Sequence, residues 1–283
     1  MEIEAGDVRL FVDVDGAKVR RSGADAHEVP TIVVVHDGPG ADHTTFKHPA
    51  FAPKLTPHAQ LVFYDHRGHG RSDESTPDRW RLDVWATDLR ALVDTLGIQD
   101  PIVFGSGFGA LVATRFASLN PGRLARLVLS RPVTRFDARR SVDIFARTVG
   151  PDAAESVLDF YASPNETSYA AWVVAIMRAY TSFTAAEVAD LLLSANWRSA
   201  PAIEWYAHEA KKFDLRSDAG ALSVPTLVLG GEDDALCPIE SVEEFASAVD
   251  GSLVRFERFP TRHAIYADDP RAMEITLEFI AGG

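Results

Sequence analysis

The chain has 283 residues, a hydrophobic content of 46% and a formal net charge of -13. The length suits one large α/β domain, or a core that carries an inserted subdomain. The negative charge argues against nucleic acid and anionic membranes as partners, because both need a surplus of Lys and Arg to offset phosphate charge.

Cysteine usage and the N-terminal segment bear on the compartment. Cys237 is the single cysteine, so no disulfide can form within the chain. The acidic start MEIEAGDVRL lacks the basic and apolar regions of a signal peptide. The longest apolar stretch, Tyr169 to Tyr180, is shorter than the roughly 20 residues that a membrane span needs. We expect a cytoplasmic protein with a buried helix at 169–180; a homo-oligomer stays an open alternative.

Short β-branched runs alternate with longer helical patterns, which is typical of a mostly parallel sheet covered by helices on both faces. A hairpin is expected up to about Asp15, with Asp15-Gly16 as its turn. Helices are expected from Arg81 to Leu96 and from Pro270 to Ile280. The predicted strands are Thr31–His36, Leu61–Asp65, Ile102–Gly105, Leu127–Ser130, Thr226–Gly230 and Leu253–Phe256.

From about Pro132 to Asp218 the strand pattern stops, and Ala-rich and aromatic-rich helical segments replace it. We expect a helical lid over residues 132–218, inserted into a core made of residues 1–131 and 219–283. The lid is rich in large rings, which are Trp172, Tyr180, Phe183, Trp197, Trp205, Tyr206 and Phe213.

The segment Val103-Phe-Gly-Ser-Gly-Phe-Gly-Ala110 is a strand that breaks into glycines and resumes as a helix. This is the context of a nucleophile elbow, G-x-S-x-G, but Gly107 stands where the serine should be. Glycine tolerates the strained, positive-φ backbone of an elbow, so the turn survives while an attacking hydroxyl is lost. Ser106 lies one residue early and should point elsewhere. A glycine-rich phosphate loop is the bland alternative.

Two later segments decide against the phosphate loop. Leu227 to Pro238 is a buried strand that runs into an acidic turn, with Asp234 as the candidate acid and Asp233 as its rival. His263 follows the last predicted strand and precedes a helix that starts at Pro270. The order elbow, acid, histidine is that of the α/β-hydrolases.

Two more segments extend this resemblance. His36-Asp-Gly-Pro-Gly40 resembles the HGGPG of proline iminopeptidase-like α/β-hydrolases and departs from it at Asp37. The segment Asp65 to Ser72 is similar to the family's D-x-R-G-x-G-x-S loop. The resemblance covers 36–270 and implies an α/β-hydrolase fold with no cofactor. Nor does the sequence show a metal-ligand spacing such as H-x-x-x-H.

The resemblance also implies residue roles. Asp234 and His263 would be catalytic, and the backbone N–H groups of Gly38 and Phe108 would form the oxyanion hole. In the D-x-R-G-x-G-x-S loop we expect structural roles for Asp65, Arg67 and Ser72, and exposed side chains for His66 and His69.

Three accounts of Gly107 compete. Glycine could have been introduced to silence a serine hydrolase, which the intact remainder of the machinery favours. Alternatively, His263 and Asp234 could work as a general-base dyad of a lyase or oxygenase. Third, the protein could bind a ligand under its lid without chemistry.

For the substrate we expect an apolar ester or lactone, contacted by Asp37, Trp172 and Tyr206, because the lid aromatics supply apolar surface. An aminopeptidase or amidase is the alternative, since proline iminopeptidases recognise a free amine with lid acids. The acids that this insertion offers are Glu155, Asp159, Glu166, Glu204 and Glu209.

Overall fold

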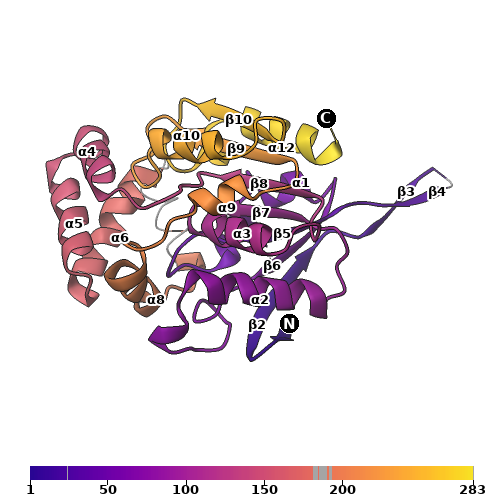
Figure 1. Ribbon diagram of the computed structural model, residues 1–283, viewed down its shortest axis with the longest axis horizontal. Coiled ribbons are helices and arrows are strands. Elements are labelled where there is room, and N and C mark those ends of the chain that lie inside the picture. Colours follow the sequence, from indigo (N-terminus) through magenta and orange to yellow (C-terminus); the bar gives the residue numbers. More distant parts are fainter. Residues whose placement is uncertain (24, 181–183, 185–189, 191–192, 283) are drawn as a thin grey trace.

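An eight-stranded, mostly parallel sheet forms the centre of the molecule (Figure 1). The computed structural model describes all residues except 24, 181–183, 185–189, 191–192 and 283. The strand order is β1-β2-β6-β5-β7-β8-β9-β10, and every pair from β6 to β10 is parallel. The strands are β1 Glu2–Ala5, β2 Val8–Asp15, β5 Thr31–Val35, β6 Gln60–Tyr64, β7 Ile102–Ser106, β8 Arg126–Ser130, β9 Thr226–Gly231 and β10 Val254–Phe259.

Helices cover both faces of the sheet, which explains why its central strands are apolar throughout. In β5, Val33 and Val35 belong to the core on the side of α2 (Leu82–Thr95), α3 (Phe108–Leu119) and α10 (Ile239–Ala248). Ile32 and Val34 point to the opposite core. That second core also holds residues of α1 (Ala52–Leu55), α11 (Ile265–Asp268) and α12 (Arg271–Ala281).

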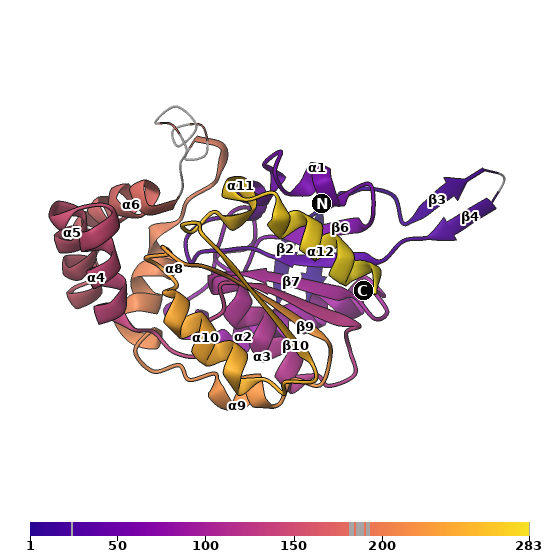
Figure 2. The ribbon, with the colours of Figure 1, turned by 90° about the horizontal axis from the view of Figure 1, so that it is seen from above.

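The N-terminal hairpin forms with a different turn from the one expected. Ala5 pairs with Val8, so Gly6-Asp7 is the turn, and Asp15 ends the longer strand β2. The prediction of Asp15-Gly16 as the turn is therefore wrong, because β2 continues across the sheet edge to pair with β6. A second hairpin, β3 (Val19–Ser22) and β4 (Asp25–Glu28), projects away from the body (Figure 2).

The first four helices described between β8 and β9 gather at one end of the molecule (Figures 1 and 2). They pack around buried side chains such as Phe145, Val157 and Phe160. At the far end of the insertion, α9 packs against α3 and α10. The inserted helices are α4 Ala138–Thr148, α5 Pro151–Ala162, α6 Glu166–Tyr180, α8 Ser199–Glu204, a π-helical turn Trp205–Glu209, and α9 Arg216–Gly220. The division into core and lid stays a prediction.

No helix in the described part of the chain has the length and hydrophobicity to cross a bilayer.

Candidate active site

Gly107 forms the apex of a sharp turn between β7 and α3. Its φ of 51° and ψ of -115° describe a backbone conformation that is strained for any residue with a side chain. Two residues on, a Cβ at Gly109 would run into the backbone carbonyl oxygens of Val35 and His36. The glycines therefore allow α3 to start directly beside the end of β5, as an elbow requires.

His263 and Asp234 meet beyond the ends of β9 and β10. The imidazole Nδ1 lies 2.9 Å from both carboxylate oxygens of Asp234, and both residues are buried. The backbone N–H groups of Leu236 and Cys237 donate to Oδ1 of Asp234 at 2.8 and 3.0 Å and fix its orientation. Asp233, the rival acid, is exposed and pairs with Arg147 at 3.4 Å.

The carboxylate of Asp37 lies between the elbow and the histidine. Its Oδ1 accepts hydrogen bonds from the N–H groups of Gly38 at 2.8 Å and Phe108 at 3.0 Å. These are the two donors that the resemblance assigns to the oxyanion hole, so here they hold a carboxylate of the chain itself. Oδ2 lies 3.1 Å from Nε2 of His263.

Asp37 also fills the space in front of residue 107. A Cβ at Gly107 would lie 2.7 Å from Cγ and Oδ2 of Asp37, and closer still to Oδ1. The two departures from the family motifs are therefore neighbours in space, and the absence of a side chain at one makes room for the carboxylate at the other.

Sequence reasoning missed Arg131, which comes directly after β8 and has a φ of 61°. It is buried, and its Nη2 lies 3.0 Å from Oδ2 of Asp37. The guanidinium also donates to Oγ of Ser106 and to the backbone carbonyl of His263. The Ser106 hydroxyl is thus held by Arg131. A charged residue at the carboxyl end of a predicted strand was the signal that could have revealed Arg131.

The charged groups of the site shift one another's pKa values. Burial alone would raise the pKa of Asp37, but His263 and Arg131 outweigh it and lower that pKa to about 2. Burial and Arg131 lower the pKa of His263, whereas Asp234 and Asp37 raise it, and the net result is a raised pKa. Both imidazole nitrogens face carboxylate oxygens, which only accept hydrogen bonds. The intact pair therefore favours the imidazolium form.

Two cavities meet at Asp37, Tyr180 and His263, which line both of them. The first lies under the inserted helices and also contains Gly38, Gly107 and Phe108. Six of the seven aromatic residues singled out in the insertion line it: Trp172, Tyr180, Trp197, Trp205, Tyr206 and Phe213. Phe183, the seventh, lies outside the described residues. The second cavity lies behind Asp37 and contains Ser106, Ser130 and Arg131.

The candidate lid acids lie away from both cavities. Glu155, Asp159 and Glu166 are exposed. Glu204 and Glu209 pair with His208 and Lys212 at 3.7 and 3.6 Å. None of the five contributes to the lining of either cavity.

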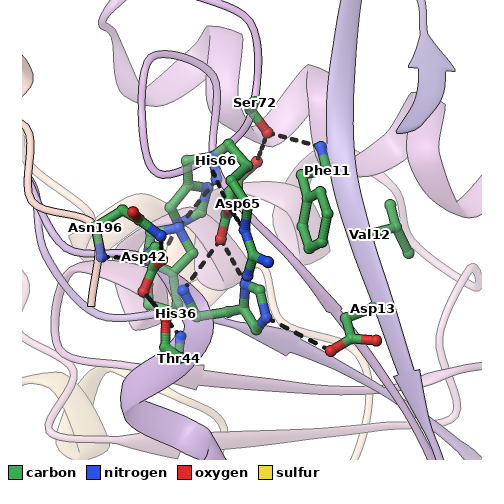
Figure 3. A network of polar contacts seen from close by, with 12 residues as sticks. Phe11, Val12, Asp13, His36, Asp42, Thr44, Asp65, His66, Ser72 and Asn196 are labelled. Carbon is green, nitrogen blue, oxygen red and sulfur yellow. Dashed lines mark hydrogen bonds and ion pairs between the residues drawn. The ribbon is translucent and has the colours of Figure 1, made fainter. Parts of the chain in front are cut away.

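A buried polar network holds the loop that carries Asp37 (Figure 3). His43 Nδ1 lies 2.5 Å from Asp65, and the N–H of His66 donates to Nε2 of His36 at 3.0 Å. Ser72 donates to the carbonyl of Asp65 at 2.6 Å, consistent with a structural role.

The loop from Asp65 to Ser72, after β6, contains two histidines whose predicted exposure is wrong. His66 and His69 are 1% and 0% exposed, because their rings pack with His36, Trp85 and Phe108. Arg67, between them, donates to Asp88 at 2.8 Å.

Within the described residues, one group of side chains has the composition of a metal site. Asp234, Cys237 and His263 offer ligand atoms within 4.8 Å of one another. However, burial raises the pKa of the Cys237 thiol, and a metal binds the thiolate. His263 already directs Nδ1 at Asp234. The hydrogen-bonded pair of Asp234 and His263 therefore accounts for this group of side chains without a metal ion.

The α/β-hydrolase fold family model matches residues 30–270, so the chain belongs to that family. A putative carbamate hydrolase RutD from Pseudomonas savastanoi is 27% identical over 79% of this chain and 83% of its own. The proline iminopeptidase PfmaB from Pestalotiopsis fici is 22% identical over 91% and 94%. The enol-lactonase structure from Burkholderia xenovorans superposes with a TM-score of 0.75 over 100% of both chains, at 21% identity. The fold and the family of this chain are therefore those of the α/β-hydrolases.

Proposed function

We propose that this protein is built as a hydrolase of a carboxylic ester or lactone of an apolar small molecule, and that Gly107 disables the serine step. The observation that carries the proposal is the buried His263–Asp234 pair at the base of an aromatic cavity, whose second ring nitrogen, Nε2, faces the Asp37 carboxylate beside the elbow.

A serine at position 107 would complete a familiar mechanism. His263 would take the hydroxyl proton while Asp234 fixed the ring and stabilised its charge. The N–H groups of Gly38 and Phe108 would hold the oxyanion. Glycine has no hydroxyl, so no acyl-enzyme forms. We expect the chain to retain at most the roughly 10³- to 10⁴-fold advantage over water that binding and an oxyanion hole supply.

Asp37 adds a second obstacle, because it occupies the donors that an ester carbonyl would need. A serine Cβ would also collide with its carboxylate. Asp37 and Gly107 fit each other in space. This fit favours a site in which both residues occur together, and it argues against the account in which glycine was introduced into an otherwise ordinary serine hydrolase.

The cavity lining supports an apolar substrate. Trp172 and Tyr206 line the cavity under the inserted helices, and we assign them, with Asp37, to substrate contact. The candidate amine-binding acids lie elsewhere, which argues against the aminopeptidase or amidase alternative. The relatives are named as a carbamate hydrolase, a proline iminopeptidase and an enol-lactonase, which act on different substrates. The proposed substrate class therefore depends on the cavity lining alone.

The test rebuilds both family motifs at once. The double variant Asp37→Gly/Gly107→Ser is compared with each single variant and with the wild type. Substrates are p-nitrophenyl hexanoate, dihydrocoumarin and proline p-nitroanilide. We expect ester and lactone hydrolysis from the double variant and much less from Gly107→Ser alone, because Asp37 still blocks the site in that variant.

Adding His263→Ala to the double variant should abolish the gained activity. A folded double variant that cleaves none of the substrates contradicts the proposal. Preference for the anilide supports an aminopeptidase instead. Ester hydrolysis by the wild type that His263→Ala abolishes supports the general-base dyad.

A further inference from the structure

We propose that the second cavity, behind Asp37, binds the carboxylate of a short aliphatic acid such as acetate. This cavity shares Asp37, Thr45, Tyr180 and His263 with the cavity under the inserted helices, and the rest of its lining is its own. Such a binding site goes beyond the proposed function, and it does not depend on the residue at position 107.

Three polar side chains of the lining come from two neighbouring strand ends. Ser106 and Ser130 are paired residues at the ends of β7 and β8, and Arg131 follows directly. In open α/β sheets, ligands bind beyond the carboxyl ends of the strands. The guanidinium of Arg131 donates to Oγ of Ser106, so the hydroxyl proton of Ser106 can itself be donated to a ligand.

Arg131 also has a donor that no described residue accepts. Its Nη2 donates to Asp37 and Ser106, and its Nη1 donates to the backbone carbonyl of His263. Its Nε is buried and has no hydrogen-bond partner among the described residues. An unpaired donor on a buried cation is costly, and a carboxylate oxygen is a strong acceptor for it. Arg131 lines the second cavity and not the first, so a ligand would reach it from the second.

Asp37 cannot fill this role itself. It is the single carboxylate among the described lining residues. Its Oδ1 accepts from two backbone N–H groups, and its Oδ2 lies within 3.5 Å of donors from Arg131, His263 and Tyr180. Asp37 is therefore saturated with donors, and a ligand carboxylate would accept from Nε and from the serine hydroxyls instead. Repulsion between the two carboxylates limits the affinity that we expect.

The remainder of the lining is largely apolar and suits a short alkyl chain. The ring of Phe51 packs against those of Phe46 and Tyr266, with centroids 5.1 and 5.2 Å apart. Ala50 and Ala267 add small side chains to the same cavity. A cavity with clustered donors and apolar rings favours an aliphatic acid over a hydrated inorganic anion.

An NMR titration of the ¹⁵N-labelled wild type with sodium acetate, in a buffer free of chloride and carboxylates, tests the site. We expect one saturable site with a Kd of about 1–10 mM, as suits a ligand of so few atoms. Acetamide has a similar shape without the charge and should bind at least about tenfold more weakly. From formate to propionate, the affinity should rise roughly fourfold for each added carbon.

Two variants should remove the site. Ala267→Leu fills the cavity and should abolish acetate binding, whereas the matched control Ala170→Leu, on the exposed face of α6, should bind as wild type does. Arg131→Lys keeps the charge but loses the guanidinium donors, and it should raise the Kd at least about tenfold. Arg147→Lys is its control, because that arginine is exposed.

Four results would overturn the inference. The first is a wild type without saturable acetate binding, in which water satisfies Nε of Arg131. The second is equal affinity for acetate and acetamide. The third is binding that survives in both Ala267→Leu and Arg131→Lys. The fourth is binding that Ala267→Leu keeps and Val133→Phe abolishes, because Val133 lines only the first cavity.

The NMR spectrum of each variant shows whether it is folded. If Arg131→Lys does not fold, Ala267→Leu and acetamide still decide the outcome. Ester hydrolysis by Asp37→Gly/Gly107→Ser is measured independently, so this inference and the proposed function can each fail while the other stands.

Discussion

Arg131 and Asp37 form a buried ion pair, in which Nη2 lies 3.0 Å from Oδ2, and the same guanidinium donates to the backbone of His263. One side chain therefore ties the loop after β5 to the loop after β10. Replacing it leaves a buried carboxylate with one fewer cation, and the backbone carbonyl of His263 with one fewer donor.

We predict that Arg131→Met lowers the free energy of unfolding by about 3–5 kcal/mol, the usual cost of removing one partner of a buried ion pair. Urea unfolding at pH 7 measures the loss. Arg147→Met is the matched control, because that arginine is exposed and its ion pair with Asp233 should contribute less than about 1 kcal/mol. Equal stability of the two variants would show that Arg131 does not hold the site together.

The contact between Gly107 and Asp37 predicts energetic coupling. Gly107→Ala places a Cβ against the Asp37 carboxylate, in a backbone conformation that itself costs about 1–3 kcal/mol. Removing the carboxylate in Asp37→Gly/Gly107→Ala should relieve the collision. We expect a coupling free energy of about 0.5–3 kcal/mol in a double-mutant cycle followed by thermal unfolding.

Gly97→Ala is the control for that cycle. Gly97 has a φ of +63° with no atom within 4 Å of the added Cβ, so its substitution carries the backbone cost without a collision. It should show no coupling to Asp37→Gly. Coupling of the same size at both glycines would mean that the space in front of residue 107 is free.

Asp234 should control the protonation of His263. We predict that Asp234→Asn lowers the imidazole pKa measured by NMR, since the carboxylate stabilises the charged ring. A raised pKa contributes stability that is complete below the unfolded value of 6.5 and is lost as the pH rises through the folded pKa. The stability gap between wild type and Asp234→Asn should therefore be widest in mild acid.

Asp233→Asn is the neighbouring control and should leave the imidazole titration unchanged, because the Asp233 side chain is exposed and pairs with Arg147. A shift caused by Asp233→Asn, with none from Asp234→Asn, would exchange the roles of the two acids.

Local pattern and motif order were enough to predict the sheet, the elbow and the pairing of Asp234 with His263. The strands are short apolar runs that end in polar residues, and the glycines at 105, 107 and 109 announce a sharp turn. The hairpin turn was misplaced, because Gly6-Asp7 and Asp15-Gly16 are both good turn signals and only the pairing of β2 with β6 chooses between them.

The electrostatic roles of Asp37 and Arg131 could not be predicted in the same way. Each lies at the end of a different strand, and their contact depends on how β5, β7 and β8 lie side by side. The spacing of Asp37 and Arg131 along the sequence does not reveal that the two side chains are in contact. His66 and His69 were misjudged for a related reason, since their loop is covered by rings from other segments, including Trp85 and Phe108.

The buried histidines under the Asp37 loop predict sensitivity to mild acid. Burial lowers the pKa of His36, of His66 and of His69, the last to about 3. Buried His66 Nδ1 and His69 Nε2 have no hydrogen-bond partner among the described residues. As the pH falls below 6.5, the pKa of histidine in the unfolded chain, the unfolded chain binds protons that the folded chain does not bind. The contribution of these residues is therefore complete above that pH and is lost below it.

Each such histidine should add up to ~1.4 kcal/mol per pH unit to the acid slope of the unfolding free energy. Urea unfolding at pH 7, 6 and 5 measures the slope, and His69→Gln should reduce it by about one proton. His58→Gln is the control, because His58 is exposed and its replacement should leave the slope unchanged. His263 acts in the opposite sense, since its raised pKa lets the folded chain bind a proton at a higher pH than the unfolded chain does. A slope that is the same in wild type and His69→Gln would mean that His69 accepts a proton in the folded protein.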